Sequence, residues 1–144
     1  MARALVLAEV FGTPYSETPL YALERALALG SQEYRIAEVG GAAELEAVAL
    51  FGSVAGTVGT ARVFLIAPTT GDMRAAAAEA LAGAVGALAS DGIRLVIAEL
   101  PDDRCFDGMR KLLLEFGFQE ESRVDNLIRD GVALTFLRYE IRTQ

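Results

Sequence analysis

Two short apolar runs separated by an alanine-rich segment constrain the fold of this chain more than any other feature. The runs span residues 61–67 and 93–98, and each is nearly free of polar side chains, as is typical of strands covered on both faces. Residues 73–90 between them are predicted to form a helix, with Asp72 as its N-cap and Asp91-Gly92 as its exit. Strands joined through a helix lie parallel in one sheet, so this order predicts a strand-helix-strand crossover.

The predicted helix has two notable features, an apolar side and two internal glycines. Gly83 and Gly86 each cost about 1 kcal/mol relative to alanine inside a helix. Close packing of the helix on the sheet is the first explanation for them, and a contact with a cofactor is the second. The residues expected on the apolar side are Ala78, Leu81, Val85 and Leu88.

Antiparallel hairpins are predicted on both sides of the crossover. Asp130-Gly131 is a strong two-residue turn signal, and Gly40-Gly41 marks a second turn. Pro101 is expected to begin a loop, and Gly117 to end a helix over residues 106–116. The predicted hairpin strands are residues 34–39 with 45–51 and residues 122–129 with 132–141, and Gln119-Glu120-Glu121 is predicted to be a solvated connection.

The N-terminal segment has a more ambiguous pattern. Residues 2–11 fit either a helix or a buried strand, and Leu20 begins a helical stripe that Gly30 ends. The length of 144 residues corresponds to a single domain, residues 1–144. We therefore expect an α+β fold: a mixed, mostly antiparallel twisted sheet flanked by helices, with one parallel crossover and a C-terminal β-hairpin.

Composition excludes several classes of function. The formal charge is −7 at pH 7, and no cluster of Lys or Arg offers the positive surface that a phosphate backbone needs, so we expect no nucleic-acid partner. The chain has no His and a single Cys, so neither a Ser/His nor a Cys/His relay can be built, and no metal site is predicted. Cys105 is expected to act as a small buried hydrophobe rather than as a reactive thiol.

The hydrophobic segments are too short for a membrane or export signal. An apolar run of five residues precedes Glu9, which is shorter than the core of a signal peptide. Residues 75–89 are weakly polar but fall short of the roughly 20 residues that span a bilayer. We therefore expect a cytoplasmic protein with no membrane partner.

Two stretches of the chain together form a family-like pattern. In the tail, Leu113-Leu-Glu-Phe-Gly-Phe-Gln-Glu-Glu-Ser-Arg-Val124 and the segment 130–137 give a helix, a Gly-Phe junction and two final strands. Upstream, Phe51-Gly52, Gly56-Thr57 and Gly59-Thr60 lead into Val63-Phe-Leu-Ile-Ala67. Over about residues 10 to 141, this combination resembles the GNAT superfamily of acyl-CoA N-acyltransferases, and it implies a GNAT-like fold with its first strand missing or reduced to residues 4–8.

The resemblance implies a binding site for acetyl-CoA as co-substrate. Members hold the CoA pyrophosphate on backbone N–H groups at a helix N-terminus, and the matching stretch here is 70–78. Only its last position agrees with the superfamily's motif, so the motif is degenerate, and Asp72 adds a negative charge that Arg74 would offset. The implied contacts are Gly71, Asp72, Met73, Arg74, Ala75 and Ala76 for the pyrophosphate, and the backbones of Leu65, Ile66 and Ala67 for the pantetheine arm.

The resemblance also identifies positions where catalytic side chains are replaced. Many members carry a Tyr that protonates the departing thiolate and an Asn seven residues earlier, and these positions hold Leu113 and Phe106. Neither replacement can donate a proton. Tyr139 and Tyr15 are the candidates to take over that role, although most such tyrosines only pack or donate a hydrogen bond.

Glu99 is the candidate general base. It ends the second apolar run, and an open sheet presents its ligand crevice beyond the carboxyl ends of its strands. Its carboxylate could accept a proton from an amine, directly or through water. A solvated carboxylate at a strand end is the simpler interpretation.

Two functions from different classes follow. The first is an N-acetyltransferase that moves an acetyl group from acetyl-CoA to the primary amine of a small molecule or peptide by direct attack. The second is a degenerate GNAT-like module without catalysis, which binds a partner or oligomerises. If the first strand is missing, an exposed sheet edge would allow such a chain to pair with another chain, for instance as a homodimer.

Overall fold

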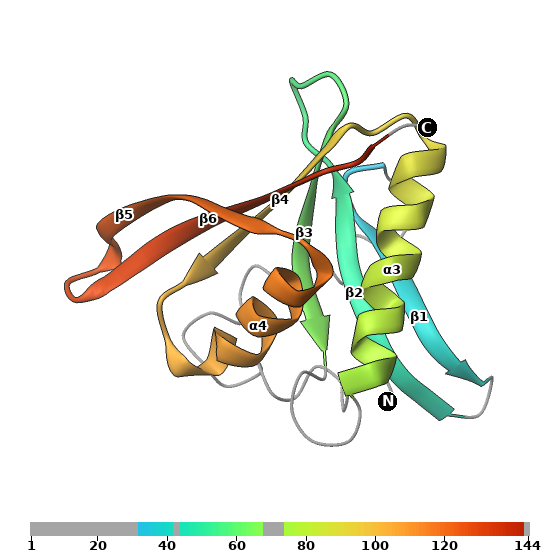
Figure 1. The fold of residues 1–144 in the computed structure, drawn as a ribbon, viewed down its shortest axis with the longest axis horizontal. Coiled ribbons are helices and arrows are strands. Elements are labelled where there is room, and N and C mark those ends of the chain that lie inside the picture. The colour runs from blue at the N-terminus through green and yellow to red at the C-terminus, as the bar shows by residue number, and fades with distance from the viewer. Residues whose placement is uncertain (1–31, 42–43, 68–73, 143–144) are drawn as a thin grey trace.

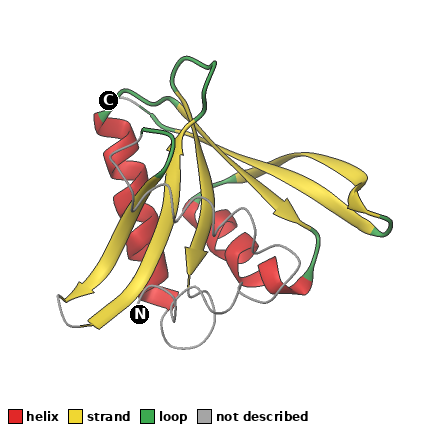
Figure 2. Ribbon diagram, turned by 180° about the vertical axis from the view of Figure 1, so that it is seen from behind, coloured by secondary structure: helices red, strands yellow, loops and turns green. Residues whose placement is uncertain are grey.

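The computed structural model describes residues 32–41, 44–67 and 74–142, and these form one mixed sheet with helices on a single face. Figures 1 and 2 show α3 and α4 on the same side of the sheet. The sheet has six strands in the order β1-β2-β3-β4-β6-β5. The elements are β1 Arg35–Gly41, β2 Glu44–Ser53, β3 Thr60–Ala67, α3 Arg74–Ser90, β4 Leu95–Pro101, the 3₁₀ turn η3 Arg104–Phe106, α4 Asp107–Phe116, β5 Gln119–Arg129 and β6 Val132–Glu140.

The predicted crossover is confirmed. Strands β3 and β4 are parallel neighbours on either side of α3, and the other strand pairs in the described sheet are antiparallel. Both predicted hairpins are present, β1 with β2 and β5 with β6. The first turn was predicted at Gly40-Gly41, but both glycines belong to β1 and pair with Leu45 and Glu44. The α+β fold class expected from the sequence is therefore correct. The predicted segments 2–11 and 20–30 lie outside the described residues.

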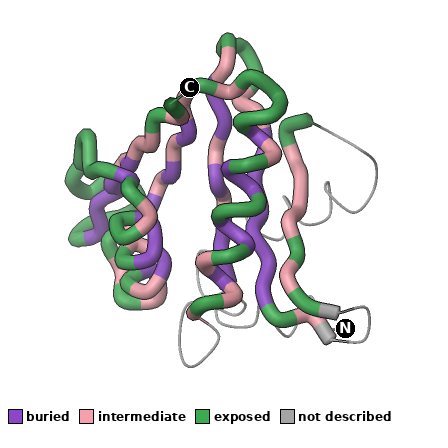
Figure 3. The backbone as a smooth tube through the Cα atoms, turned by 45° about the vertical axis from the view of Figure 1, so that its right-hand side comes forward, coloured by how far each residue is buried: buried purple, intermediate pink, exposed green. Residues whose placement is uncertain are grey.

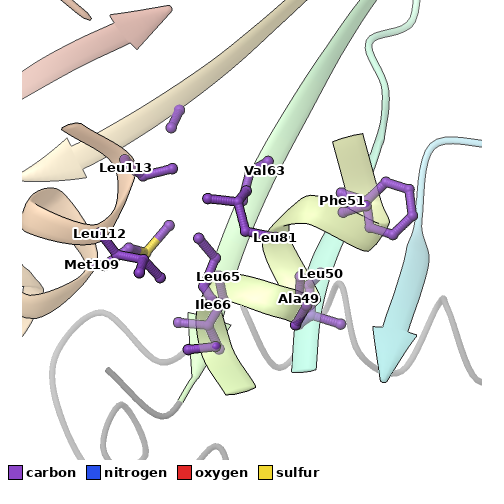
Figure 4. Close-up of a cluster of buried hydrophobic side chains, with 14 of the residues drawn as sticks. Ala49, Leu50, Phe51, Val63, Leu65, Ile66, Leu81, Met109, Leu112 and Leu113 are labelled. Atoms are coloured by element: carbon purple, nitrogen blue, oxygen red, sulfur yellow. The ribbon is translucent and has the colours of Figure 1, made fainter. Parts of the chain in front are cut away.

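The core lies between the two helices and strands β2 to β4. Leu81 and Leu88 of α3 and Leu113 of α4 are fully buried against β-strand residues such as Leu50 and Leu65. Burying one such side chain contributes about 1.5–3 kcal/mol. Figure 3 shows the buried residues running along the central strands beneath α3, and Figure 4 shows Leu81 of α3 and Leu113 of α4 directed toward the strand residues.

Helix α3 packs through small residues, as its sequence requires. Ala77, Ala80 and Ala84 are buried along with the predicted Leu81 and Leu88, whereas Ala78 is only half-buried. The prediction that Gly83 and Gly86 pack closely on the sheet is wrong. Both are exposed, and a Cβ at either position would meet nothing within 4 Å, because they lie on the solvent side of the helix.

Strand β4 is longer than predicted at its carboxyl end. Pro101 was expected to begin a loop, but it is the last residue of the strand and pairs with Leu134 of β6. Proline is tolerated there because a strand end does not need every ladder hydrogen bond. The run 93–98 was also expected to be covered on both faces, but Ile97 is only half-buried. One face of β4 is therefore less covered than the other.

The C-terminal hairpin extends away from the rest of the sheet. Gly131 has a φ of 83°, which fits the predicted turn, and its N–H donates to Asn126 Oδ1 at 2.8 Å. Asn126 itself has a φ of 59°, and the register shifts between Val124 and Arg129. The predicted connection Gln119-Glu120-Glu121 is solvated as expected, but it belongs to β5, whose residues are all exposed.

Candidate functional site

Strands β3 and β4 separate partway along their length, which Figure 1 shows as a V between them. Their parallel pairing covers Thr60–Val63 against Leu95–Ala98 and then stops, although both strands continue. Each strand stays paired with its outer neighbour, β3 with β2 through Ala67 and β4 with β6 through Pro101. The side of Phe64–Ala67 that faces the V therefore has no strand partner among the described residues. We call the end of the pairing, at Val63 and Ala98, the apex.

A β-bulge at Phe64 accounts for the separation. In the pairing of β2 with β3, Leu50 lies opposite Leu65 and Phe51 lies opposite Val63, so Phe64 is an extra residue. A bulge bends its strand and increases the local twist. Because the bulge lies at the apex, it turns β3 away from β4 directly beyond their last pair.

The predicted pantetheine contacts Leu65, Ile66 and Ala67 lie along this unpaired edge of β3. Their side chains are fully buried and fill the core. Only their backbone groups can therefore contact a ligand in the V, and unpaired N–H groups that face such a gap are available donors.

Glu99 lies at the apex, as the first residue of β4 beyond the pairing. One of its carboxylate oxygens, Oε1, is 3.2 Å from Nη2 of Arg62, and both side chains are about one third exposed (33% and 35%). Arg62 belongs to the paired part of β3, opposite Ile97. The ion pair thus crosses from β3 to β4 and holds the carboxylate at the opening of the V.

Helix α3 and helix α4 are joined across the face of the sheet. Arg74 Nη2 lies 2.6 Å from Glu115 Oε2, and this hydrogen bond lowers the pKa of Glu115 below its ordinary value. A mainly apolar cavity of about 210 Å³ lies between the two helices, lined by Ala78, Leu81, Leu112, Glu115 and Phe116. Arg74 is therefore placed at the beginning of α3, as predicted, but it already has an anionic partner.

The remaining predicted pyrophosphate contacts are only partly described. Ala75 is exposed and Ala76 half-buried in the first turn of α3. Gly71, Asp72 and Met73, and with them the predicted N-cap, lie outside the described residues.

The two positions where many GNAT members carry a catalytic Tyr and Asn are part of the core here. Leu113 is completely buried and Phe106 is nearly so. Tyr139 stacks on Phe118 at a centroid distance of 5.3 Å and contacts Phe116 edge-on at 5.1 Å. It also lines a larger cavity of about 630 Å³ between Val85 of α3, the junction of α4 with β5 and the end of β6. Tyr139 thus packs among aromatic rings at the edge of a cavity, and Tyr15, the other candidate acid, lies outside the described residues.

Neither a metal site nor a membrane span is present in the described segments. No group of three His, Cys, Asp or Glu side chains there could hold a metal ion. None of the helices found there is long and apolar enough to cross a bilayer.

Comparison with solved structures identifies the fold. A protein assigned to the GNAT family of acetyltransferases, from Desulfovibrio desulfuricans, superposes with a TM-score of 0.76 at 24% identity, over 94% of this chain and 90% of that one. The chain has the GNAT fold. The aminoglycoside 6'-N-acetyltransferase of Enterococcus faecium gives a TM-score of 0.76 at 10% identity, over 98% of this chain and 89% of its own.

A third similar structure contains CoA, and the resemblance in the sequence implies its acetylated form as co-substrate. This acetyltransferase of Bacillus subtilis, in complex with CoA, has a TM-score of 0.59 at 11% identity and covers 73% of this chain and 75% of its own. No protein-family model matches the chain, and no curated protein sequence does. The GNAT fold is therefore shown by structure alone.

Sequence reasoning missed three parts of the site. The bulge at Phe64 is hidden in an uninterrupted apolar run, and the ion pairs of Arg62 with Glu99 and of Arg74 with Glu115 join residues that are 37 and 41 positions apart. The only signal for the first pair was an isolated Arg within the run 61–67. A charged residue in a strand otherwise covered on both faces needs a partner.

Proposed function

We propose that this protein is an N-acetyltransferase that transfers an acetyl group from acetyl-CoA to a primary amine by direct attack. The separation of β3 from β4 carries the proposal. It leaves the backbone of Phe64–Ala67 without a strand partner on one side and puts the carboxylate of Glu99 at the opening. A ligand that lay in the V would accept hydrogen bonds from the backbone of β3, and the carboxylate of Glu99 would lie beside it at the apex as a base.

The residues that the structure describes are compatible with CoA. The unpaired edge of β3 offers N–H donors of the kind that an amide-containing pantetheine arm needs, and Arg74 supplies a cation at the first turn of α3. The cavity between α3 and α4 offers an apolar wall beside that cation. When bound, acetyl-CoA supplies an activated thioester, whose C–S bond breaks as the bond from carbon to the amine nitrogen forms.

The chain would act on the amine through position and charge. Glu99 accepts a proton from the ammonium of the acceptor, directly or through water, and this leaves the neutral amine that attacks the thioester. Backbone N–H groups of β3 polarise the acetyl carbonyl in a site from which water is partly excluded. Because Leu113 and Phe106 cannot donate a proton, the departing sulfur takes its proton from solvent.

The test is the release of free thiol from acetyl-CoA in the presence of a panel of primary amines. Wild type is expected to release thiol in an amine-dependent way, and Glu99→Gln to lower kcat by about 10²-fold or more, since general-base catalysis contributes at least that. Glu121→Gln, on the exposed strand β5, is the control. Absence of amine-dependent thiol release would overturn the proposal.

The second candidate function is a GNAT-like module that has lost catalysis. The specific observations in its favour are the complete burial of Leu113, where many members carry the acid, and the pairing of Arg74 with Glu115. Such a module would fold normally but would not bind CoA, which makes the two functions separable by one binding measurement.

A further inference from the structure

A row of polar and aromatic side chains crosses the sheet toward the apex. The rings of Tyr34 and Phe64 are stacked, with centroids 5.6 Å apart and an interplanar angle of 18°. The guanidinium of Arg62 lies 5.7 Å from the centroid of the Phe64 ring, and its Nη2 contacts Glu99. The row thus runs from the segment before β1 across β3 to the first residue of β4 beyond the apex.

A cavity of about 230 Å³ lies alongside this row. Tyr34 and Phe64 give it an apolar wall, while Arg62, Glu33 and Ser53 give it polar groups. Phe64 lines the cavity and is also the bulged residue at the apex. The cavity therefore adjoins the place where the V opens.

The backbone around the cavity is closely packed. Ser53 N donates to Gln32 O at 2.6 Å, and a Cβ on Gly52 would lie 2.0 Å from the carbonyl oxygen of Glu33. The segment that carries Glu33 and Tyr34 therefore lies directly on Gly52. This contact fixes the ring of Tyr34 over Phe64 and gives the cavity a defined shape.

Arg62 lines this cavity and has a donor that no hydrogen bond among the described residues uses. Its Nε is buried and has no hydrogen-bond partner within the described part of the chain, and its ion pair with Glu99 engages Nη2 alone. A guanidinium carries several N–H donors arranged to bind a carboxylate with two parallel hydrogen bonds. A buried donor without a partner is costly, so a ligand oxygen that reached this group would be bound favourably.

We propose that the acceptor is a free α-amino acid with an apolar side chain, which rests on the proposed acetyl transfer. Arg62 receives its carboxylate, Glu99 receives its ammonium, and its side chain enters the cavity against Tyr34 and Phe64. Arg62 and Glu99 present opposite charges 3.2 Å apart. An α-amino acid carries its own opposite charges on a single carbon, so the two pairs are complementary.

Other amines fit this arrangement less well. An amine without a carboxylate has no group that could accept hydrogen bonds from Arg62. The donors of that guanidinium which the ion pair with Glu99 does not use would then stay without a partner. The N-terminus of a peptide presents a neutral amide in place of the carboxylate, and its chain would have to leave a cavity of only about 230 Å³. Charge and size therefore both favour the free amino acid.

The experiment is isothermal titration calorimetry of the full chain in the absence of CoA. The ligands are L-leucine, L-methionine and L-phenylalanine. Phenethylamine and L-phenylalaninamide, which keep the ring and the amine but lack the carboxylate, are titrated in parallel. We expect at least one amino acid to bind, and L-phenylalanine to bind at least about tenfold more tightly than either analogue, since charge-assisted hydrogen bonds to Arg62 are lost with the carboxylate. Equal affinity for the acid and its analogues, or no binding of any amino acid at millimolar concentration, would overturn the proposal.

Variants of Arg62 test the assignment of the carboxylate. Arg62→Gln is expected to remove the preference for the acid, and Arg62→Lys, which keeps the charge but not the planar fork, to retain a part of it. Arg138→Gln is the matched control, because Arg138 is equally exposed and also ion-paired but does not line this cavity. Circular dichroism shows whether each variant is folded, and a full preference in a folded Arg62→Gln would contradict the assignment.

The outcomes separate this inference from the proposed function. Amino acids that bind to a protein with no affinity for CoA would support the pocket and remove the acetyl transfer. Thiol release with phenethylamine as efficient as with L-phenylalanine would support acetyl transfer and remove the amino-acid acceptor.

Discussion

Arg74 Nη2 lies 2.6 Å from Glu115 Oε2, so the first residue of α3 is tied to the last turn of α4. The two residues are 41 positions apart, and Glu115 also lines the apolar cavity between the helices. The same guanidinium is the cation expected to face a diphosphate. Glu115 therefore both positions Arg74 and competes with any anionic ligand for it.

Removing the charge of Arg74 should weaken CoA binding, whereas removing the charge of Glu115 should not. Arg74→Glu is expected to abolish the rise in melting temperature that CoA produces, because it replaces the cation with a repelling charge. Glu115→Gln should leave that rise intact or increase it, since Arg74 loses its competitor. Thermal denaturation over a range of CoA concentrations measures both.

The control for this charge reversal is Arg129→Glu. Arg129 is about half exposed at the end of β5 and lies 3.9 Å from Asp103, far from α3 in sequence and in the sheet order. A loss of the CoA effect in Arg129→Glu as large as in Arg74→Glu would show that overall charge, not Arg74, controls binding.

Cys105 should react slowly with alkylating reagents near neutral pH. Burial, followed by the negative charge of Asp103, raises the pKa of its thiol from 9.0 to about 11. Since the thiolate is the reactive form, the rate of iodoacetamide labelling should keep rising up to about pH 11 and lag that of the urea-unfolded chain. The raised pKa stabilises the fold below pH 9, and this contribution is lost as the pH rises toward 11. A folded protein labelled as fast as the unfolded one would contradict this.

Glycine substitutions should have opposite effects in two parts of the fold. Gly86→Ala is expected to raise the free energy of unfolding by about 1 kcal/mol, because the position is helical, exposed and free of neighbours. Gly52→Ala should lower it by about 1–3 kcal/mol or more, since its Cβ would meet the backbone of Glu33. Urea denaturation measures both.

The same two glycine variants separate effects on stability from effects on ligand binding. If Gly86→Ala weakened CoA binding while raising stability, the exposed face of α3 would contact the ligand. The two glycines in this helix would then be explained by a contact with a cofactor, the second explanation given for them in the sequence analysis. Gly52→Ala should weaken amino-acid binding more than CoA binding, because it displaces Glu33 and Tyr34 at the cavity.

Restoring the acid of the GNAT pattern should not succeed by a single substitution. Leu113→Tyr places a larger, polar side chain in a completely buried position and is expected to destabilise the fold by about 1–3 kcal/mol. Leu114→Tyr, at a neighbouring position that is 42% exposed, should change stability by no more than about 0.5 kcal/mol. A stable Leu113→Tyr variant with raised kcat would show that this position faces the ligand.

The sequence predicts the elements better than it predicts the site. The apolar run 61–67 and the turn at Asp130-Gly131 carry local signals, the first of a strand and the second of hairpin geometry, and both elements were predicted correctly. The run was expected to be covered on both faces, but Arg62 and Phe64 are only half-buried. The exposed side of α3 was misjudged because an internal glycine has the same sequence signal whether it packs closely or faces solvent.

The site depends on relationships that no local pattern contains. The V requires that β3 and β4 stop pairing at Val63 and Ala98, which follows from a bulge at Phe64 and from the register that each strand keeps with its outer neighbour. The partner of Glu99 is set by the same register. A residue-by-residue reading could locate Glu99 at a strand end but could not bring Arg62 to it.

The central claim is that the V between β3 and β4 binds CoA. Calorimetric titration of CoA into the wild-type chain tests it most directly. We predict saturable binding of one CoA per chain, competed by acetyl-CoA and weakened in Arg74→Glu. A chain that circular dichroism shows to be folded but that yields no binding heat at millimolar CoA would contradict the account and leave the GNAT fold without its transferase function.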